Sequence, residues 1–348
     1  MSRRDGTTAA ALPWLAEVQT PPASLPADAP RLSPLMVDGA GRPIATVAAW
    51  ERRRAELREQ WLDYMGRFPE ERGPVSLTVL EEDRDTGCVR QLVQYESEPG
   101  LPVEGYLLFP ENPEGSVPGV VVLHSTITYS IRQPAGLEGP ESLFFALKLA
   151  QRGYAAFAPR CFSFQYREPG SRDVMACVHW LKARRPDVRG MAKLLHDARR
   201  AVDVLESLPI VDRERIGAIG HSLGGKEALY LAAFDERVKA TVSSEGGVGL
   251  AFCNWHAPWY LGEEIRREGF PMENHQVLAL VAPRAFLLLG GNHSDGDRSW
   301  PFIEAVQPVY RLYGAEERIG LLNHRQGHAV PPEAGERAYA WLDHFLGE

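Results

Sequence analysis

Apolar and polar residues alternate with a period of two between residues 75 and 110. Three such runs, 75–82, 89–97 and 103–110, are separated by the turn-forming stretches DRDTG and EPGLP. This alternation predicts strands that bury one face, and the short turns favour antiparallel pairing of neighbours. We therefore expect an antiparallel meander in this part of the chain.

Beyond residue 118 the pattern changes to continuous apolar runs that alternate with helical periodicity. The predicted strands are 119–124, 154–159, 215–220, 238–244, 284–290 and 318–323. The predicted helices lie near 141–152, 190–207, 223–234, 302–313 and 333–346. This alternation predicts an α/β fold, in which helices cover both faces of a mostly parallel sheet. In such sheets, ligands bind beyond the carboxyl ends of the strands.

The segments that flank these elements complete the expected organisation. Residues 1–42 are rich in proline and alanine, which predicts an extended N-terminal arm. Residues 44–66 carry Trp50 and Trp61 at helical spacing among charged residues, which predicts an amphipathic helix docked on the domain. We expect one α/β domain over 43–348, with 246–275 as a small lid-like insertion.

Composition and charge exclude several classes of partner. The net charge is −8 over 348 residues. Such an acidic chain argues against a nucleic-acid partner, which would need a basic face. No apolar run approaches the roughly 18 residues that span a bilayer, so no membrane partner is expected. The N-terminus lacks the apolar core of a signal peptide, and the four cysteines show no paired spacing. These features favour a cytoplasmic location.

The stretch GHSLGG (220–225) lies between the predicted strand 215–220 and the predicted helix 223–234. It matches G-x-S-x-G in the strand–turn–helix context that holds a nucleophilic serine on a sharp turn. Glycines are needed there because the turn is cramped, and the helix N-terminus directs N–H groups at a developing oxyanion. We therefore predict Ser222 as the nucleophile. A phosphate-binding loop is disfavoured because neither G-x-G-x-x-G nor a Walker pattern is present.

A serine nucleophile needs a general base, and two histidines are candidates. His328 follows the last predicted strand and precedes the last predicted helix, the position of the base in this chain order. His324 lies four residues earlier, closer to the strand end. Loop position favours His328.

The acid that orients the base has candidates after two different strands. Asp297, with Asp295 in the same loop, follows the strand 284–290, the commonest place for the acid. Glu245 follows the strand 238–244, and a neighbouring imidazolium would satisfy its buried charge. Position alone favours Asp297 over Glu245.

We expect the oxyanion hole and the substrate pocket to lie at the carboxyl ends of the same strands. We expect the N–H of Leu223 to act with an N–H from the loop after 119–124, near Ser125 or Thr126. Trp255 and Trp259, in the insertion, suit an apolar or sugar-stacking wall, although packing under a long loop explains them equally well.

No metal or cofactor is expected. His293, Asp295 and Asp297 gather in the stretch GNHSDGDRS, but acidic residues and glycines in a turn are typical of a solvated loop.

With a serine, a histidine and an acid at these positions, the sequence from 75 to 346 resembles that of the α/β-hydrolase superfamily. SSEGGVGLAFCNW (243–255) is similar to the stretch in which glucuronoyl esterases carry their triad glutamate, and ENHQVLALVAPRAFLLLGGN (273–292) is similar to their approach to the next strand. Acetyl xylan esterases and dienelactone hydrolase-like proteins are related. The resemblance implies that Glu245 is the acid, ahead of Asp297.

The elbow departs from the glucuronoyl esterase pattern, Gly-Cys-Ser-Arg-x-Gly-Lys. His221 replaces the cysteine, and Leu223 replaces an arginine that assists the oxyanion in that family. Lys226 is kept, which implies a contact with a sugar-acid substrate. The resemblance thus supports ester hydrolysis without fixing the ester.

We therefore predict a serine hydrolase that cleaves a carboxylic ester, carbohydrate-linked by resemblance, through a triad and an acyl-enzyme. One alternative is a serine peptidase of the prolyl-oligopeptidase type, which would need a gating domain larger than residues 1–110. Another is a non-catalytic binding module on a hydrolase fold, which would predict damage to the serine, base or acid.

Overall fold

A single mixed sheet organises the protein. The computed structural model describes residues 12–69, 73–165 and 173–347, and in these ranges nine strands form one sheet in the order β1-β2-β3-β5-β4-β6-β7-β8-β9. The strands are β1 (Thr78–Asp83), β2 (Val89–Glu98), β3 (Leu101–Phe109), β4 (Val117–Leu123), β5 (Ala155–Pro159), β6 (Val211–His221), β7 (Val238–Ser244), β8 (Ala285–Gly290) and β9 (Ile319–Asn323).

The pairing confirms the predicted fold class. β1, β2 and β3 form an antiparallel meander, and β3 pairs antiparallel with β5. The remaining strands pair parallel in the order β5-β4-β6-β7-β8-β9, which makes six parallel strands. Their registers align the carboxyl ends of β4, β6 and β7, with Leu123 opposite Gly220 and His221 opposite Ser244. The residues that follow these three strands are therefore close together.

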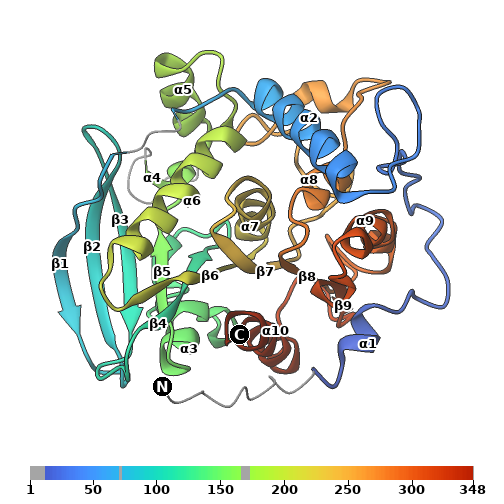
Figure 1. The fold of residues 1–348 in the computed structure, drawn as a ribbon. Helices are drawn as coiled ribbons and strands as arrows, with labels where there is room; N and C mark the ends of the chain where they lie inside the picture. Colours follow the sequence, from blue (N-terminus) through green and yellow to red (C-terminus); the bar gives the residue numbers. More distant parts are fainter. Residues whose placement is uncertain (1–11, 70–72, 166–172, 348) are drawn as a thin grey trace.

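Helices cover both faces of the parallel strands (Figure 1). α3 and α10 pack on one face, and α6 and α7 pack on the other. The α-helices are α1 (Leu15–Val18), α2 (Val47–Met65), α3 (Phe145–Gln151), α4 (Phe162–Gln165), α5 (Met175–Arg184), α6 (Gly190–Ser207), α7 (Leu223–Phe234), α8 (Asn274–Ala279), α9 (Trp300–Leu312) and α10 (Pro332–Gly347). In the described part of the chain, no helix combines the length and apolarity needed to span a bilayer.

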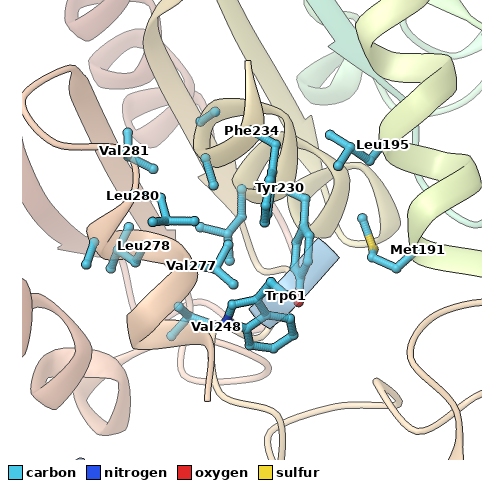
Figure 2. Close-up of a cluster of buried hydrophobic side chains, with 14 of the residues drawn as sticks. Trp61, Met191, Leu195, Tyr230, Phe234, Val248, Val277, Leu278, Leu280 and Val281 are labelled. Carbon is cyan, nitrogen blue, oxygen red and sulfur yellow. The ribbon is translucent and has the colours of Figure 1, made fainter. Parts of the chain in front are cut away.

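The predicted amphipathic helix is α2. The side chain of Thr46 caps its N-terminus by accepting the amide of Ala49 at 3.2 Å. Its buried stripe packs where α6, α7 and α8 meet, and Figure 2 shows Trp61 beside Tyr230 of α7 and Met191 of α6. The rings of Trp61 and Tyr230 meet edge to face, with centroids 5.8 Å apart. This helix therefore supports α7, which follows the candidate nucleophile.

The N-terminal arm packs against β9, one of the two edge strands of the sheet. Residues 1–11 of the predicted arm lie outside the described residues, and the described part runs past β9 before it reaches α2 (Figure 1). Val18 is fully buried, and a side chain at Gly320 of β9 would overlap it. The amide side chain of Gln19 donates to the backbone carbonyl of Ile319 at 3.4 Å. The arm thus engages one of the backbone carbonyls that an edge strand would expose.

Candidate active site

Ser222 sits on a strained turn between β6 and α7. Its φ of 60° and ψ of −113° lie in a region that non-glycine residues rarely occupy. Two backbone bonds hold the turn: the Ser222 amide donates to the Ser244 carbonyl at 2.8 Å, and the Lys226 amide donates to the Ser222 carbonyl at 3.2 Å. Ser222 remains partly exposed while His221 and Leu223 beside it are buried. The turn thus presents one side chain to solvent.

The glycines that flank Ser222 allow three backbone segments to approach. A Cβ at Gly220 would overlap the carbonyl of Gly224, and a Cβ at Gly224 would overlap the carbonyl of Leu123. The start of α7 therefore lies directly against the ends of β6 and β4, as the motif predicts.

His328 and Glu245 meet beside this turn. His328 lies in the loop between β9 and α10, and its Nδ1 is 3.1 Å from Oε2 of Glu245, which follows β7. The Glu245 side chain is fully buried, whereas the His328 side chain is 35% exposed. A buried carboxylate on Nδ1 holds an imidazole in the tautomer whose Nε2 is free to accept a proton.

Backbone amides fix the Glu245 carboxylate. Glu245 has a φ of 50°, and its side chain accepts the amides of Gly291 and Ser294, the latter at 2.7 Å. Burial alone would raise the pKa of Glu245, but the bonds from His328, Ser294 and Gly291 lower it below the ordinary value. The carboxylate is therefore ionised and oriented at neutral pH.

The other candidate acids are engaged elsewhere. Asp297 accepts hydrogen bonds from the side chains of Asn323 at 2.8 Å and Arg325 at 3.2 Å. Asp295 is fully buried and accepts the amides of Gly247 and Val248, both at 2.7 Å. Asp295 thus joins the loop after β8 to the loop after β7. The geometry favours Glu245 over Asp297 as the partner of the base.

The competing histidine has a different environment. His324 Nδ1 accepts the amide of Gln326 at 3.1 Å, within its own loop. Burial lowers the pKa of His324. The geometry therefore supports His328 over His324 as the base.

The residues predicted to supply the oxyanion donors lie on two segments beside the Ser222 turn. Leu223 is the first residue of α7, so its amide belongs to the helix N-terminus. Ser125 lies in the loop after β4, and its hydroxyl donates to the carbonyl of His221 at 3.4 Å. Ser125 is buried, while Thr126 beside it is exposed. Both segments therefore border the Ser222 turn.

His124, which directly follows β4, links two loops through hydrogen bonds. Its Nδ1–H donates to the Ser125 carbonyl at 2.8 Å, and its Nε2 accepts the amide of Cys161 at 3.1 Å. These bonds hold the imidazole between the loops after β4 and β5.

His221, which replaces a family cysteine, packs against the candidate base. Its Nδ1 is 3.0 Å from the Ser244 hydroxyl, and its ring centroid is 4.7 Å from that of His328. Burial, followed by the proximity of His328, lowers the pKa of His221 to about 3. The ring is therefore neutral at pH 7 and does not repel an imidazolium on His328.

The predicted wall residues are placed differently. Trp255 is fully buried, its indole N–H donates to the Gly247 carbonyl at 2.6 Å, and its ring packs on Tyr230. The expectation that Trp255 contacts substrate is therefore wrong, because its ring has no exposed surface. Trp259 is half-buried and stays a candidate.

Lys226 lies under the site. Its ammonium donates to the Gly246 carbonyl and sits 5.2 Å from the Trp255 ring centroid. The residue is only 3% exposed, and burial lowers its pKa. A contact between Lys226 and a substrate remains a prediction.

His293 lies beside the candidate base, a position that the sequence did not predict. It was considered only for a metal site with Asp295 and Asp297, yet its ring centroid lies 4.7 Å from that of His328. Its Nδ1 is 3.6 Å from Oε2 of Glu245. The signal available was its position in the loop after β8, where loops converge on the site.

Glu227, on the first turn of α7, makes a pH-dependent contribution to stability. Burial raises its pKa to about 8, and among the described residues its Oε1 has no partner. The folded protein then keeps a proton that the unfolded chain releases above about pH 4.5. Stability contributed by this proton is complete below that pH and is lost as the pH rises towards 8.

We therefore expect Glu227→Gln to remove this decline. Relative to wild type, its free energy of unfolding should gain about 3–5 kcal/mol between pH 5 and 9, at about 1.4 kcal/mol per unit of pKa. Urea unfolding across that pH range measures the difference. Glu304→Gln, an exposed position on α9, is the matched control and should follow wild type. Parallel pH profiles for wild type and Glu227→Gln would contradict the assignment.

Several known proteins are similar to this chain in sequence. The model of the dienelactone hydrolase family matches residues 103–253. The putative hydrolase YtaP of Bacillus subtilis (strain 168) is 27% identical over 317 residues, covering 84% of this chain and all of that protein. A 4-O-methyl-glucuronoyl methylesterase of Neurospora crassa is 23% identical over 183 residues, covering 42% of this chain and 45% of that one.

Solved structures share the fold across most of the chain. A glucuronoyl esterase from Solibacter usitatus aligns with a TM-score of 0.74 at 18% identity, covering 93% of this chain and 99% of that one. A putative acetyl xylan esterase from Bacteroides fragilis aligns with a TM-score of 0.63 at 16% identity, covering 81% and 77%. The sheet order, the serine turn and these alignments lead to one conclusion: the chain has the α/β-hydrolase fold, and its residues 103–253 are similar to the dienelactone hydrolase family.

Proposed function

We propose that this protein is a serine hydrolase that cleaves a carbohydrate-linked carboxylic ester. The observation that carries the proposal is the bond between His328 Nδ1 and the buried, amide-bound Glu245 carboxylate beside the strained Ser222 turn. The relatives named as glucuronoyl methylesterases, and the putative hydrolase that aligns over its whole length, support the reaction class.

The mechanism follows from the three side chains. Ser222 attacks the ester carbonyl while His328 Nε2 takes the hydroxyl proton, and Glu245 stabilises the resulting imidazolium. The proton then passes to the leaving alcohol, which departs and leaves an acyl-serine. A water molecule activated by the same histidine attacks the acyl-serine and releases the acid. Each step uses only groups of this chain, the substrate and water.

The amide of Leu223 and an amide near Ser125 or Thr126 would bind the oxyanion. Both belong to preformed backbone, which costs no reorganisation when charge develops on the carbonyl oxygen. Leu223 supplies no cationic side chain where the glucuronoyl esterase pattern has arginine. We therefore infer that backbone donors carry the oxyanion stabilisation here.

A panel of esters tests the proposal. Turnover of p-nitrophenyl acetate, a sugar acetate and a methyl glucuronate ester should be measured beside an aminoacyl anilide. We expect ester turnover, with one of the sugar esters preferred over p-nitrophenyl acetate in kcat/KM. Faster cleavage of the anilide would favour a peptidase, and the absence of any turnover by folded protein would favour a binding module.

A further inference from the structure

Three side chains that commonly ligate metals converge at the proposed triad. One potential ligand atom from each of Glu245, His293 and His328 lies within 4.8 Å of the other two. Glu245 Oε2 is 3.1 Å from His328 Nδ1 and 3.6 Å from His293 Nδ1. The proposed ester hydrolysis uses Glu245 and His328 but assigns no task to His293.

Two of the three ligand separations, both measured from Glu245 Oε2, are close to those in a zinc site. Bonds of about 2.0–2.2 Å in tetrahedral geometry place ligand atoms about 3.3 Å apart, between the two separations found here. The His293 side chain is 61% exposed, and its Nδ1 lies 3.1 Å from the Ser294 hydroxyl, a contact that a bound metal would replace. Two imidazoles and one carboxylate leave a fourth position for water.

Two backbone amides orient the Glu245 carboxylate, and both can stay bonded to it when a metal binds. The Ser294 amide donates to Glu245 Oε2 at 2.7 Å, and the Gly291 amide donates to Oε1. Such outer bonds orient the ligating carboxylates of metal sites. The set differs from the one considered from the sequence, since Asp295 accepts backbone amides and Asp297 pairs with Arg325.

We propose that Glu245, His293 and His328 bind a divalent transition metal ion such as Zn²⁺, and that bound metal reversibly inhibits the enzyme. The metal takes the lone pair of His328 Nδ1, so the imidazole proton moves to Nε2. A protonated Nε2 cannot accept the proton of Ser222, and the bond between His328 and Glu245 is replaced by bonds to the metal. Binding stands on the geometry alone, whereas inhibition rests on the proposed function.

The site is tested first by binding. Calorimetric titration of metal-free protein with Zn²⁺ should give one saturable equivalent, and Co²⁺ should give the visible absorption of a tetrahedral site. His293→Ala should weaken Zn²⁺ by about 10-fold or more. Ser222→Ala and His179→Ala, an exposed histidine on α5, should bind as wild type does. Equal binding by His293→Ala and wild type, or no saturable binding by wild type, would overturn the site.

Inhibition is tested separately on the same proteins. Zn²⁺ should slow ester turnover and fluorophosphonate labelling of wild type, EDTA should restore both, and His293→Ala should need about 10-fold more Zn²⁺ when compared with its own metal-free rate. Metal binding that depends on His293 without any inhibition would overturn the regulatory half. If no ester is turned over, calorimetry still decides the site, so the two proposals fail independently.

Discussion

Replacing Ser222 with alanine is expected to lower kcat/KM for the preferred ester by about 10⁴- to 10⁶-fold. The alanine removes the only group that can form the acyl-enzyme in the proposed mechanism, while the turn keeps its backbone bonds to Ser244 and Lys226. Steady-state turnover measures the loss, and the thermal midpoint checks the fold.

Ser207→Ala is the matched control for this prediction. Its hydroxyl donates to the Val204 carbonyl at the end of α6, away from the candidate site. The control should keep its activity within about twofold, because exposed substitutions rarely disturb a distant site. A Ser222→Ala variant that retained most of its turnover would remove the serine from the mechanism.

Replacing Glu245 with glutamine is expected to lower kcat/KM by about 10³- to 10⁴-fold, the size of effect seen when a triad acid loses its charge. The amide can no longer stabilise an imidazolium on His328, and it places an N–H₂ group among the amides of Gly291 and Ser294. The same assay measures the change, with the loss expected mainly in kcat.

Asp297→Asn distinguishes the two candidate acids when it is compared with Glu245→Gln. Asp297 is bonded to Asn323 and Arg325, so its neutralisation should change kcat/KM by less than about threefold. A variant with Glu245→Asp, which keeps the charge on a shorter side chain, should recover part of the activity. Full activity in Glu245→Gln together with a large loss in Asp297→Asn would reverse the assignment.

Local sequence patterns predicted the sheet and the serine turn because both depend on neighbouring residues. Apolar runs of five to seven residues bounded by glycine or proline identify buried strands, and the motif from Gly220 to Gly224 describes contacts within one turn. The helices α1, α4, α5 and α8 were not predicted. The 6 residues of α8 are too few for a clear helical period.

Contacts between distant loops were harder to predict. Position after β8 favoured Asp297 as the acid, but the φ of 50° at Glu245 turns that carboxylate towards the amides of the β8 loop. The Glu245 assignment came from family resemblance. Likewise, the sequence could not show that Trp255 is buried. Its ring packs against Tyr230 on α7 and against Tyr260 elsewhere in the insertion.

The role of His293 depends on two loops that meet only in the folded chain. Its partners are Glu245, which follows β7, and His328, which follows β9. Because β8 pairs with both β7 and β9, the three loops converge at one edge of the sheet. The parallel order was predictable, but the direction of an exposed imidazole within a glycine-rich loop was not.

Covalent labelling by a fluorophosphonate tests the central claim most directly. The reagent reacts with a serine only when a neighbouring base activates its hydroxyl. Intact-mass and peptide analysis should find one adduct per chain, located on Ser222, and labelling should be lost in Ser222→Ala and strongly slowed in His328→Ala. Folded wild-type protein that takes up no label, or that carries it on another residue, would contradict the triad of Ser222, His328 and Glu245.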